Sequence, residues 1–180
     1  SSGGYGAMYN ALVKPNHWDA VVSHSGDVGF DTMFMPTFAE TITHISRYES
    51  PAKYVDSILK APKMNSADFH TLMICAMAAS YDPGEISDSN PFGIQLPVEM
   101  NYCDIDEKRW SKWLEFDTLK LIETHFENLK LLNLLFIDCG NQDQYGIQYG
   151  SRKLTARLSQ LGVNHTWQEF DGTHSSIDHR

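Results

Sequence analysis

A serine, an aspartate and a histidine follow one another in an order that can support nucleophilic catalysis. Ser1 opens the run Ser1–Ala7, which contains three glycines, while Asp143 and His174 lie near the other end of the chain. A serine hydroxyl is a poor nucleophile at neutral pH. It needs a base within about 3 Å, and the base needs a third group to fix its tautomer. Ser1, Asp143 and His174 are therefore our candidate nucleophile, acid and base.

The opening run matches the second half of the G-x-S-x-G turn, in which a strand reverses sharply into a helix. A side chain two residues from the apex serine would collide with the strand or helix, so glycine is used there. With Ser1 at the apex, Gly3 is the following glycine, and the backbone N–H of Ser2 can donate to an oxyanion. Ser2 with Gly4 is the alternative pairing. A Ser-Gly terminus without function is the other interpretation.

The spacing of apolar residues predicts the elements that position these candidates. We expect a helix from the glycines to near Pro15, and then a strand within Trp18–Gly26. Two further strands, Leu131–Asp138 and His165–Phe170, precede the loops that carry the candidate acid and base. Sites in open parallel sheets lie just past the carboxyl ends of the strands. The three candidates should therefore meet at one edge of a sheet.

Each candidate has a competitor. Asp138 is the alternative acid, although it lies within the predicted strand, and His179 is a more distant alternative base. An aspartate such as Asp143 is often only a turn residue, and His174 can be a solvated loop residue.

The middle of the chain has a different character, with broken helices and one long loop. The predicted segments are a helix at Pro51–Lys60, a helix at Phe69–Ser80 capped within Ser66–Asp68, a loop at Tyr81–Tyr102, one or two helices over Glu107–Lys130, and a helix at Ile147–Leu161.

Four side chains are candidates for contact with a substrate. His24 follows the first predicted strand, and Phe92, Trp110 and Trp113 are large aromatic residues of the middle segment. The aromatic side chains can shape an apolar pocket or simply pack the segment. His24 has a core or turn role as its alternative.

Composition limits the functional classes. The chain has 180 residues, enough for one domain with a sizeable core, and a net charge of −9, which argues against nucleic acid as the main partner. No apolar run approaches the roughly 18 residues of a membrane span. Three widely spaced cysteines, Cys75, Cys103 and Cys139, indicate neither a zinc site nor a disulfide framework. Buried thiols in a reducing compartment favour a cytoplasmic location. No metal or organic cofactor is expected, and the oligomeric state stays open.

Several of these stretches together resemble the α/β-hydrolases, close to the esterase D and enterochelin-esterase-like groups. The resemblance covers nearly the whole chain and rests on Ser1–Ala7, Val21–Gly26, Pro91–Pro97, Trp110–Leu114, Asp138–Tyr145 and Asp171–Ser176.

The resemblance implies an α/β fold: part of an α/β-hydrolase, with a mostly parallel sheet flanked by helices. Residues 1–180 would form a single domain with a helical, loop-rich insert near residues 27–130. Members of the family begin before the elbow and continue past the base loop. The chain is therefore expected to be truncated at both ends, with the second oxyanion donor outside it.

The resemblance also implies a Ser1, Asp143 and His174 triad that hydrolyses small-molecule carboxylic esters through an acyl-enzyme. Acyl transfer to another acceptor and peptide cleavage use the same triad and are alternatives. A non-catalytic binding module with a hydrolase fold is a third.

Overall fold

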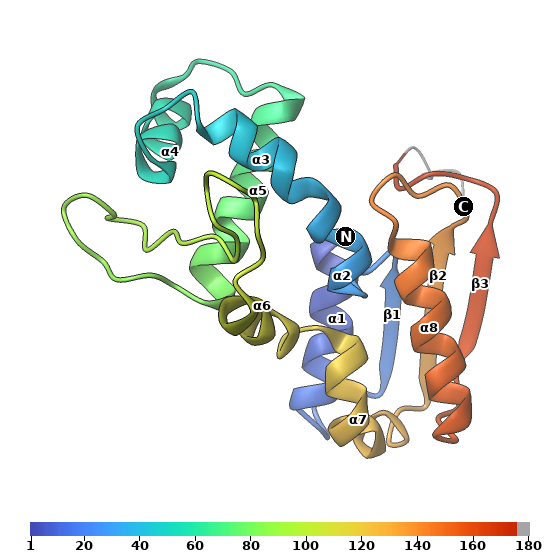
Figure 1. Ribbon diagram of the computed structural model, residues 1–180. Helices are drawn as coiled ribbons and strands as arrows, with labels where there is room; N and C mark the ends of the chain where they lie inside the picture. The colour runs from blue at the N-terminus through green and yellow to red at the C-terminus, as the bar shows by residue number, and fades with distance from the viewer. Residues whose placement is uncertain (176–180) are drawn as a thin grey trace. The chain divides into compact units, whose positions relative to one another are not determined.

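The computed structural model describes residues 1–175 and is a mixed α/β fold, in which a small parallel sheet is flanked by helices (Figure 1). The predicted α/β class is therefore confirmed. In chain order the elements are α1 (Ser2–Val13), β1 (Ala20–His24), α2 (Phe30–Met33), the 3-10 helix η1 (Met35–Thr37), α3 (Phe38–Ile45), α4 (Pro51–Lys60), α5 (Ser66–Tyr81), α6 (Glu107–Leu114), α7 (Thr118–Leu129), β2 (Leu134–Gly140), α8 (Ile147–Gln160) and β3 (Thr166–Phe170).

The sheet has the strand order β1-β2-β3, and both pairings are parallel. At the carboxyl end of the sheet, His24 of β1 lies beside Asp138 of β2, and Gly140 of β2 lies beside Phe170 of β3. The loops that follow β2 and β3 therefore leave the sheet side by side, at the edge where β1 also ends.

The chain divides into two compact units. One comprises Ser1–Met35 and Glu115–Arg180 and carries the sheet, and the other comprises Pro36–Leu114. Helices α2 and α7 fall within the predicted insert range 27–130, yet they belong to the unit that carries the sheet.

Helices of the first unit pack against one side of its sheet. Helix α1 packs along β1, α8 packs on β2, and α7 contacts both helices. The interior between them is apolar, with Leu12, Ile122, Ile137 and Leu154 almost fully buried. Burial of such side chains is the main source of stability for this layer.

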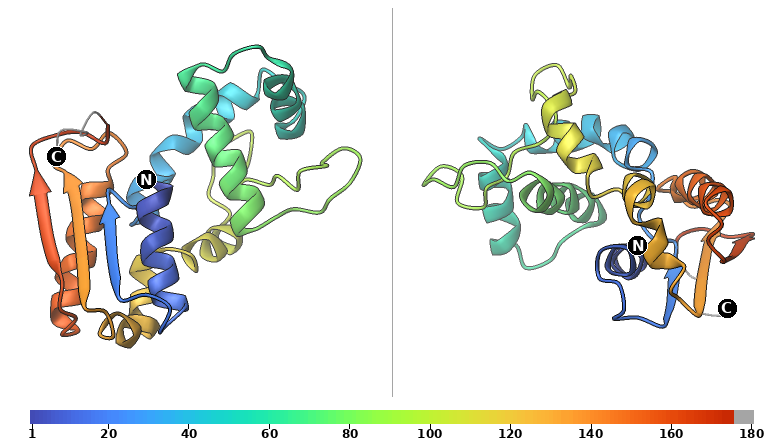
Figure 2. Two further views of the ribbon diagram at one scale, coloured as in Figure 1. Left: turned by 180° about the vertical axis from the view of Figure 1, so that it is seen from behind. Right: turned by 90° about the horizontal axis from the view of Figure 1, so that it is seen from below.

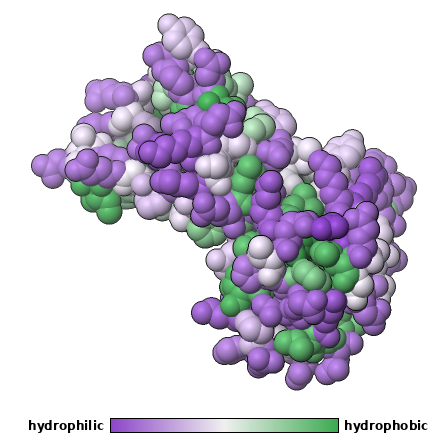
Figure 3. Space-filling view, turned by 60° about the horizontal axis from the view of Figure 1, so that its bottom comes forward, coloured by the Kyte–Doolittle hydropathy of each residue, from purple (hydrophilic) through white to green (hydrophobic). Residues whose placement is uncertain are grey.

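The other face of the sheet is covered by no helix of the first unit within residues 1–175, as the view from behind shows (Figure 2). Val22 of β1 and Leu134 of β2 are 40% and 46% exposed. Parallel sheets are normally buried on both faces, so the exposure of these two side chains is unusual for the class. Figure 3 shows the molecule from another side, where hydrophobic patches lie among hydrophilic residues at the surface.

The second unit is helical, with an aromatic core. Phe38 of α3 packs edge to face against Trp110 and Trp113 of α6, at centroid distances of 5.6 and 5.9 Å. The predicted helix at Pro51–Lys60 is confirmed as α4, and the Ser50 hydroxyl caps it. None of the helices in the described part of the chain is long and apolar enough to cross a bilayer.

Two local predictions are wrong. Helix α5 is capped by Asn65 rather than within Ser66–Asp68, because the Asn65 side chain accepts from the Asp68 N–H while Asp68 closes a reciprocal capping box. The second strand begins at Leu134 rather than Leu131. Residues 131–133 instead form the turn that ends α7, and the Leu131 N–H donates to the carbonyl of Asn128.

Candidate active site

Ser1 lies where the chain enters α1, at the end of that helix that faces the carboxyl edge of the sheet. It is the N-cap residue of α1, and its carbonyl accepts from the N–H of Tyr5 at 3.0 Å. Ser2 is already in the first turn, where helical N–H groups lack carbonyl partners within the helix. A helix N-terminus of this kind favours negative charge, which is the property that an oxyanion site requires.

The close approach expected at Gly3 falls on Gly4 instead. A Cβ at Gly4 would lie 2.7 Å from the His24 carbonyl oxygen and 2.8 Å from Gly26 Cα, whereas a Cβ at Gly3 would come no nearer than 3.7 Å to Ser1 Oγ. Gly4 therefore lets α1 cross the end of β1 at backbone contact distance. The expectation for Gly3 was wrong because the helix turns its Gly4 side, not its Gly3 side, toward the strand.

Asp27 lies beside the start of α1. Its carboxylate is buried, and Oδ2 accepts from the Ser2 hydroxyl at 3.4 Å. Ser25 has φ of 42°, a left-handed conformation that costs a non-glycine residue about 1–3 kcal/mol and is frequent at functional sites.

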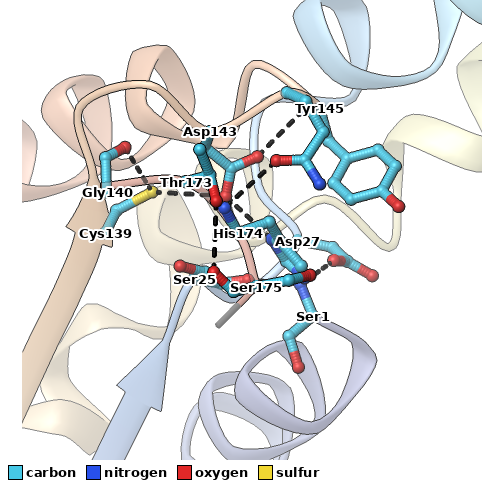
Figure 4. A network of polar contacts seen from close by, with 11 residues as sticks. Ser1, Ser25, Asp27, Cys139, Gly140, Asp143, Tyr145, Thr173, His174 and Ser175 are labelled. Carbon is cyan, nitrogen blue, oxygen red and sulfur yellow. Dashed lines mark hydrogen bonds and ion pairs between the residues drawn. The ribbon is translucent and has the colours of Figure 1, made fainter. Parts of the chain in front are cut away.

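The structure brings Asp143 and His174 together. His174 Nδ1 lies 2.8 Å from Asp143 Oδ2; the Asp143 side chain is inaccessible to solvent, and the His174 side chain is 18% exposed (Figure 4). Asp143 follows β2 and His174 follows β3, so the parallel register of the strands places the two loops in contact. An Nδ1–H that points at the carboxylate leaves Nε2 as the ring nitrogen able to accept a proton.

Neighbouring groups fix both partners of this pair. The Tyr145 N–H donates to Asp143 Oδ1 at 2.9 Å, and the Tyr145 ring meets the imidazole edge to face, at 4.9 Å and 87°. The main-chain N–H of His174 donates to Gln144 Oε1 at 3.1 Å. Asp143 is therefore held at both of its carboxylate oxygens. His174 is held both at its imidazole ring and at its main-chain N–H.

Backbone hydrogen bonds join the two loops. The N–H of Asn141 donates to the Phe170 carbonyl at 2.8 Å, and the N–H of Gln142 donates to the Gly172 carbonyl at 2.9 Å. A Cβ at Gly140 would lie 2.3 Å from that same Gly172 oxygen, so only glycine fits there. This close contact determines the separation between the acid and base loops.

Ser1 is near this pair but is not joined to it. Within residues 1–175 the Ser1 hydroxyl has no hydrogen bond to His174, and it points away from the imidazole in Figure 4. Ser1 could give a proton to His174 only after a rotation of the serine side chain or a movement of the loop that carries the imidazole.

The competitors named from the sequence lie elsewhere. Asp138 contacts His24 instead of His174: Asp138 Oδ1 lies 2.9 Å from His24 Nδ1, and the His24 side chain is 62% exposed on the uncovered face of the sheet. His179 lies outside the described residues.

The aromatic candidates all belong to the second unit. Trp110 and Trp113 are buried in its core, 2% and 0% exposed, which is the packing role that the sequence left open. Phe92 is 41% exposed and lines a cavity of about 440 Å³ together with Lys53 and Asp56. Residues 1–175 contain no group of three or more histidine, cysteine, aspartate and glutamate side chains arranged to hold a metal ion.

Sequence reasoning missed several residues around the site: Asp27, Cys139, Gln144 and Tyr145. Asp27 follows the Gly26 that ends the first predicted strand, and this position was a usable signal. Gln144 and Tyr145 follow Asp143 in the same loop, and they contact His174, about thirty positions away. Cys139 lies in β2 and faces Asp143 across the turn that follows the strand. No local pattern reports such contacts.

Comparisons with known proteins give a structural likeness but no match in sequence. No family model matches the chain, and no curated protein matches it. Among solved structures, the chain is similar to S-formylglutathione hydrolase (FrmB) from Staphylococcus aureus, in the crystal structure of its apoenzyme, with a TM-score of 0.45 and 15% sequence identity. The similarity covers 97% of this chain and 45% of that protein, so the chain spans less than half the length of the hydrolase it resembles.

Proposed function

We propose that this chain carries the catalytic residues of a serine-dependent carboxylic ester hydrolase. The observation that supports this most strongly is the hydrogen bond between His174 Nδ1 and Asp143 Oδ2, 2.8 Å long, at the carboxyl edge of a parallel sheet. A buried aspartate that orients a partly exposed histidine is the arrangement that a catalytic triad uses for its acid and base. Ser1, at the start of a helix at the same edge, is the nucleophile in this proposal.

The reaction would proceed in two stages. Ser1 Oγ attacks the acyl carbonyl while His174 Nε2 takes its proton, and Asp143 stabilises the imidazolium that forms. His174 then gives the proton to the leaving alcohol. In the second stage a water molecule, deprotonated by the same nitrogen, attacks the acyl-enzyme. The bond from Ser1 Oγ to the acyl carbon breaks, the acid leaves, and His174 returns the proton to Ser1 Oγ. The N–H of Ser2 supplies one donor to the oxyanion in both stages.

The domain arrangement fits this proposal. The first unit is built from two separated stretches of the chain, and Pro36–Leu114 lies between them in sequence. We propose that Pro36–Leu114 is an insert in one hydrolase domain, and that small-molecule esters are the substrates.

The proposal is tested on the full-length protein with a fluorophosphonate probe and with p-nitrophenyl acetate turnover. We expect labelling and turnover in the wild type, and loss of both in Ser1→Ala. Ser2→Ala is the matched control, since it keeps its main-chain N–H and removes only a hydroxyl one position away. It should retain both activities. Loss in Ser2→Ala and retention in Ser1→Ala would move the nucleophile to Ser2. A folded wild type without labelling would favour a non-catalytic binding module.

A further inference from the structure

The Cys139 side chain contacts Asp143, the candidate acid. Cys139 is the penultimate residue of β2 and is fully buried. Its Sγ is 3.8 Å from Asp143 Oδ2 and 3.5 Å from the Gly140 carbonyl oxygen (Figure 4). Both of these neighbours are acceptors without a proton, so the thiol can act only as the donor toward them.

The thiol keeps its proton across the physiological range. Burial is the main cause that raises the pKa of the Cys139 thiol to about 12. The negative charge of Asp143 acts in the same direction, while the hydroxyl of Ser25 opposes the shift. A protonated thiol next to the carboxylate adds a donor there and adds no second negative charge.

The thiol and the imidazole share one oxygen of the acid. Asp143 Oδ2 accepts from His174 Nδ1 and faces the Cys139 thiol, while Oδ1 accepts from the Tyr145 N–H. Rotation of the carboxylate about its Cβ–Cγ bond would break these contacts together. The thiol therefore resists the rotation that would turn Oδ2 away from the imidazole.

We propose that Cys139 is a positioning residue that holds the Asp143 carboxylate in the orientation required by His174. This inference rests on the proposed function, because the orientation matters for ester hydrolysis only if His174 is the base. Cys139 would act through Asp143 and would not contact the substrate. The effect belongs to the chemical step, so it should appear in kcat and leave KM unchanged.

Cys75 provides a matched control. It is also a buried thiol with a pKa raised by burial to about 12, but it lies in α5 of the second unit. Replacement of either cysteine by alanine removes the same atoms from a buried environment. Only the replacement at Cys139 removes a contact to Asp143.

The test compares Cys139→Ala, Cys139→Ser and Cys75→Ala in the full-length protein, with ester turnover and the NMR signal of the His174 Nδ1–H as readouts. We expect kcat to fall by about threefold to tenfold in Cys139→Ala, which corresponds to one modest hydrogen bond, with partial recovery in Cys139→Ser. The Nδ1–H signal should shift or broaden in Cys139→Ala alone. Cys75→Ala should match the wild type in both readouts.

Three results would overturn the inference. The first is wild-type kcat in Cys139→Ala. The second is a loss of kcat with an unchanged Nδ1–H signal, and the third is an equal loss in Cys75→Ala. A wild type that neither turns over the ester nor takes the fluorophosphonate would refute the proposed function instead. In that case the NMR signal of the His174 Nδ1–H alone tests the contact between Cys139 and Asp143. A change of this signal in Cys139→Ala supports the contact, and an unchanged signal overturns the inference.

Discussion

At the scale of single residues, the candidate site depends on a carboxylate that is both buried and fully engaged. An ionised group inaccessible to solvent is costly unless hydrogen bonds replace its hydration. Asp143 has such bonds, from the Tyr145 N–H on one oxygen and from His174 on the other. These contacts fix the orientation of the Asp143 carboxylate. The hydrogen bond to Asp143 in turn fixes the orientation of the His174 imidazole.

Asp143→Asn should therefore remove catalysis while it leaves the fold intact. An amide at this position favours the wrong tautomer of His174 and no longer stabilises the imidazolium, so we expect kcat to fall by about 10⁴-fold. Asp138→Asn is the control, since Asp138 is a buried aspartate five positions earlier that contacts His24. Steady-state kinetics on both variants would check this, and the opposite ranking would make Asp138 the acid.

Asp117 is a second buried carboxylate of the first unit, and its role is structural. It caps α7 at the N–H of Leu119 and also accepts from the N–H groups of Gly29 and Phe30 at 3.1 and 2.8 Å. Burial raises the pKa of Asp117, although these three hydrogen bonds oppose the shift. The folded protein thus binds the Asp117 proton more tightly than the unfolded chain does.

The contribution of Asp117 to the free energy of unfolding depends on pH. A raised pKa in the folded state contributes stability that is complete below the unfolded pKa, about 3.9, and is lost as pH rises through the folded value. The free energy of unfolding of the wild type, relative to Asp117→Asn, should therefore decrease as pH rises from about 4. Urea unfolding at several pH values measures this. An increase with pH would contradict this account of Asp117.

The sequence was informative about residue types and less so about contacts. It named Ser1, Asp143 and His174, because a polar residue just past a strand can be recognised locally, and the structure joins two of them. It could not indicate that Cys139 faces Asp143, because a buried cysteine in an apolar strand looks like ordinary core. It also could not indicate the rotamer of Ser1.

At the scale of elements, the site depends on how closely the loops after β2 and β3 approach each other. The absence of a side chain at Gly140 allows the Gly172 carbonyl oxygen to come within 2.3 Å of the position that a Cβ would occupy. A Cβ there would push against backbone, which cannot move aside as a flexible side chain can.

Gly140→Ala should separate the acid and base loops. We expect a loss of about 1–3 kcal/mol in the free energy of unfolding, as for other overpacked sites, and a fall in kcat of up to about 100-fold. Gly6→Ala in α1 is the control: no atom lies within 4 Å of its added Cβ, and alanine favours a helix over glycine by about 1 kcal/mol. It should be neutral or stabilising. Equal thermal stability and equal kcat in the two variants would refute the role given to Gly140.

Most elements were predictable because their signals are local. Pro51 and Lys60 bound α4 as expected, since proline favours the first turn of a helix and the following Pro62 prevents its continuation. The start of β2 was not predictable. Leu131 and Leu132 are apolar and extend the strand pattern, but they belong to the turn that closes α7.

At the scale of the whole molecule, the described helices of the first unit cover the sheet on one side only. The other face carries the exposed apolar side chains of Val22 and Leu134. Apolar area of this kind on a parallel sheet is normally buried against another element. The sequence alone could not show this, because strand patterns do not say which face a helix covers.

Residues 1–180 produced alone should therefore bind a hydrophobic dye such as ANS. Lysines at this face lower its apolar area, so Val22→Lys with Leu134→Lys should reduce the dye fluorescence. Leu59→Lys is the control, because Leu59 is 71% exposed but lies in α4 of the second unit. Equal fluorescence from all three proteins would show that the uncovered face does not bind the dye.

The identity of the nucleophile is the central claim about the molecule, and peptide mapping tests it most directly. The full-length wild type is treated with a fluorophosphonate, digested and analysed by mass spectrometry. We predict one adduct, on Ser1, that is prevented by the Asp143→Asn or His174→Ala substitution. An adduct on any other residue, or none on a folded and otherwise intact protein, would contradict the Ser1, Asp143 and His174 triad.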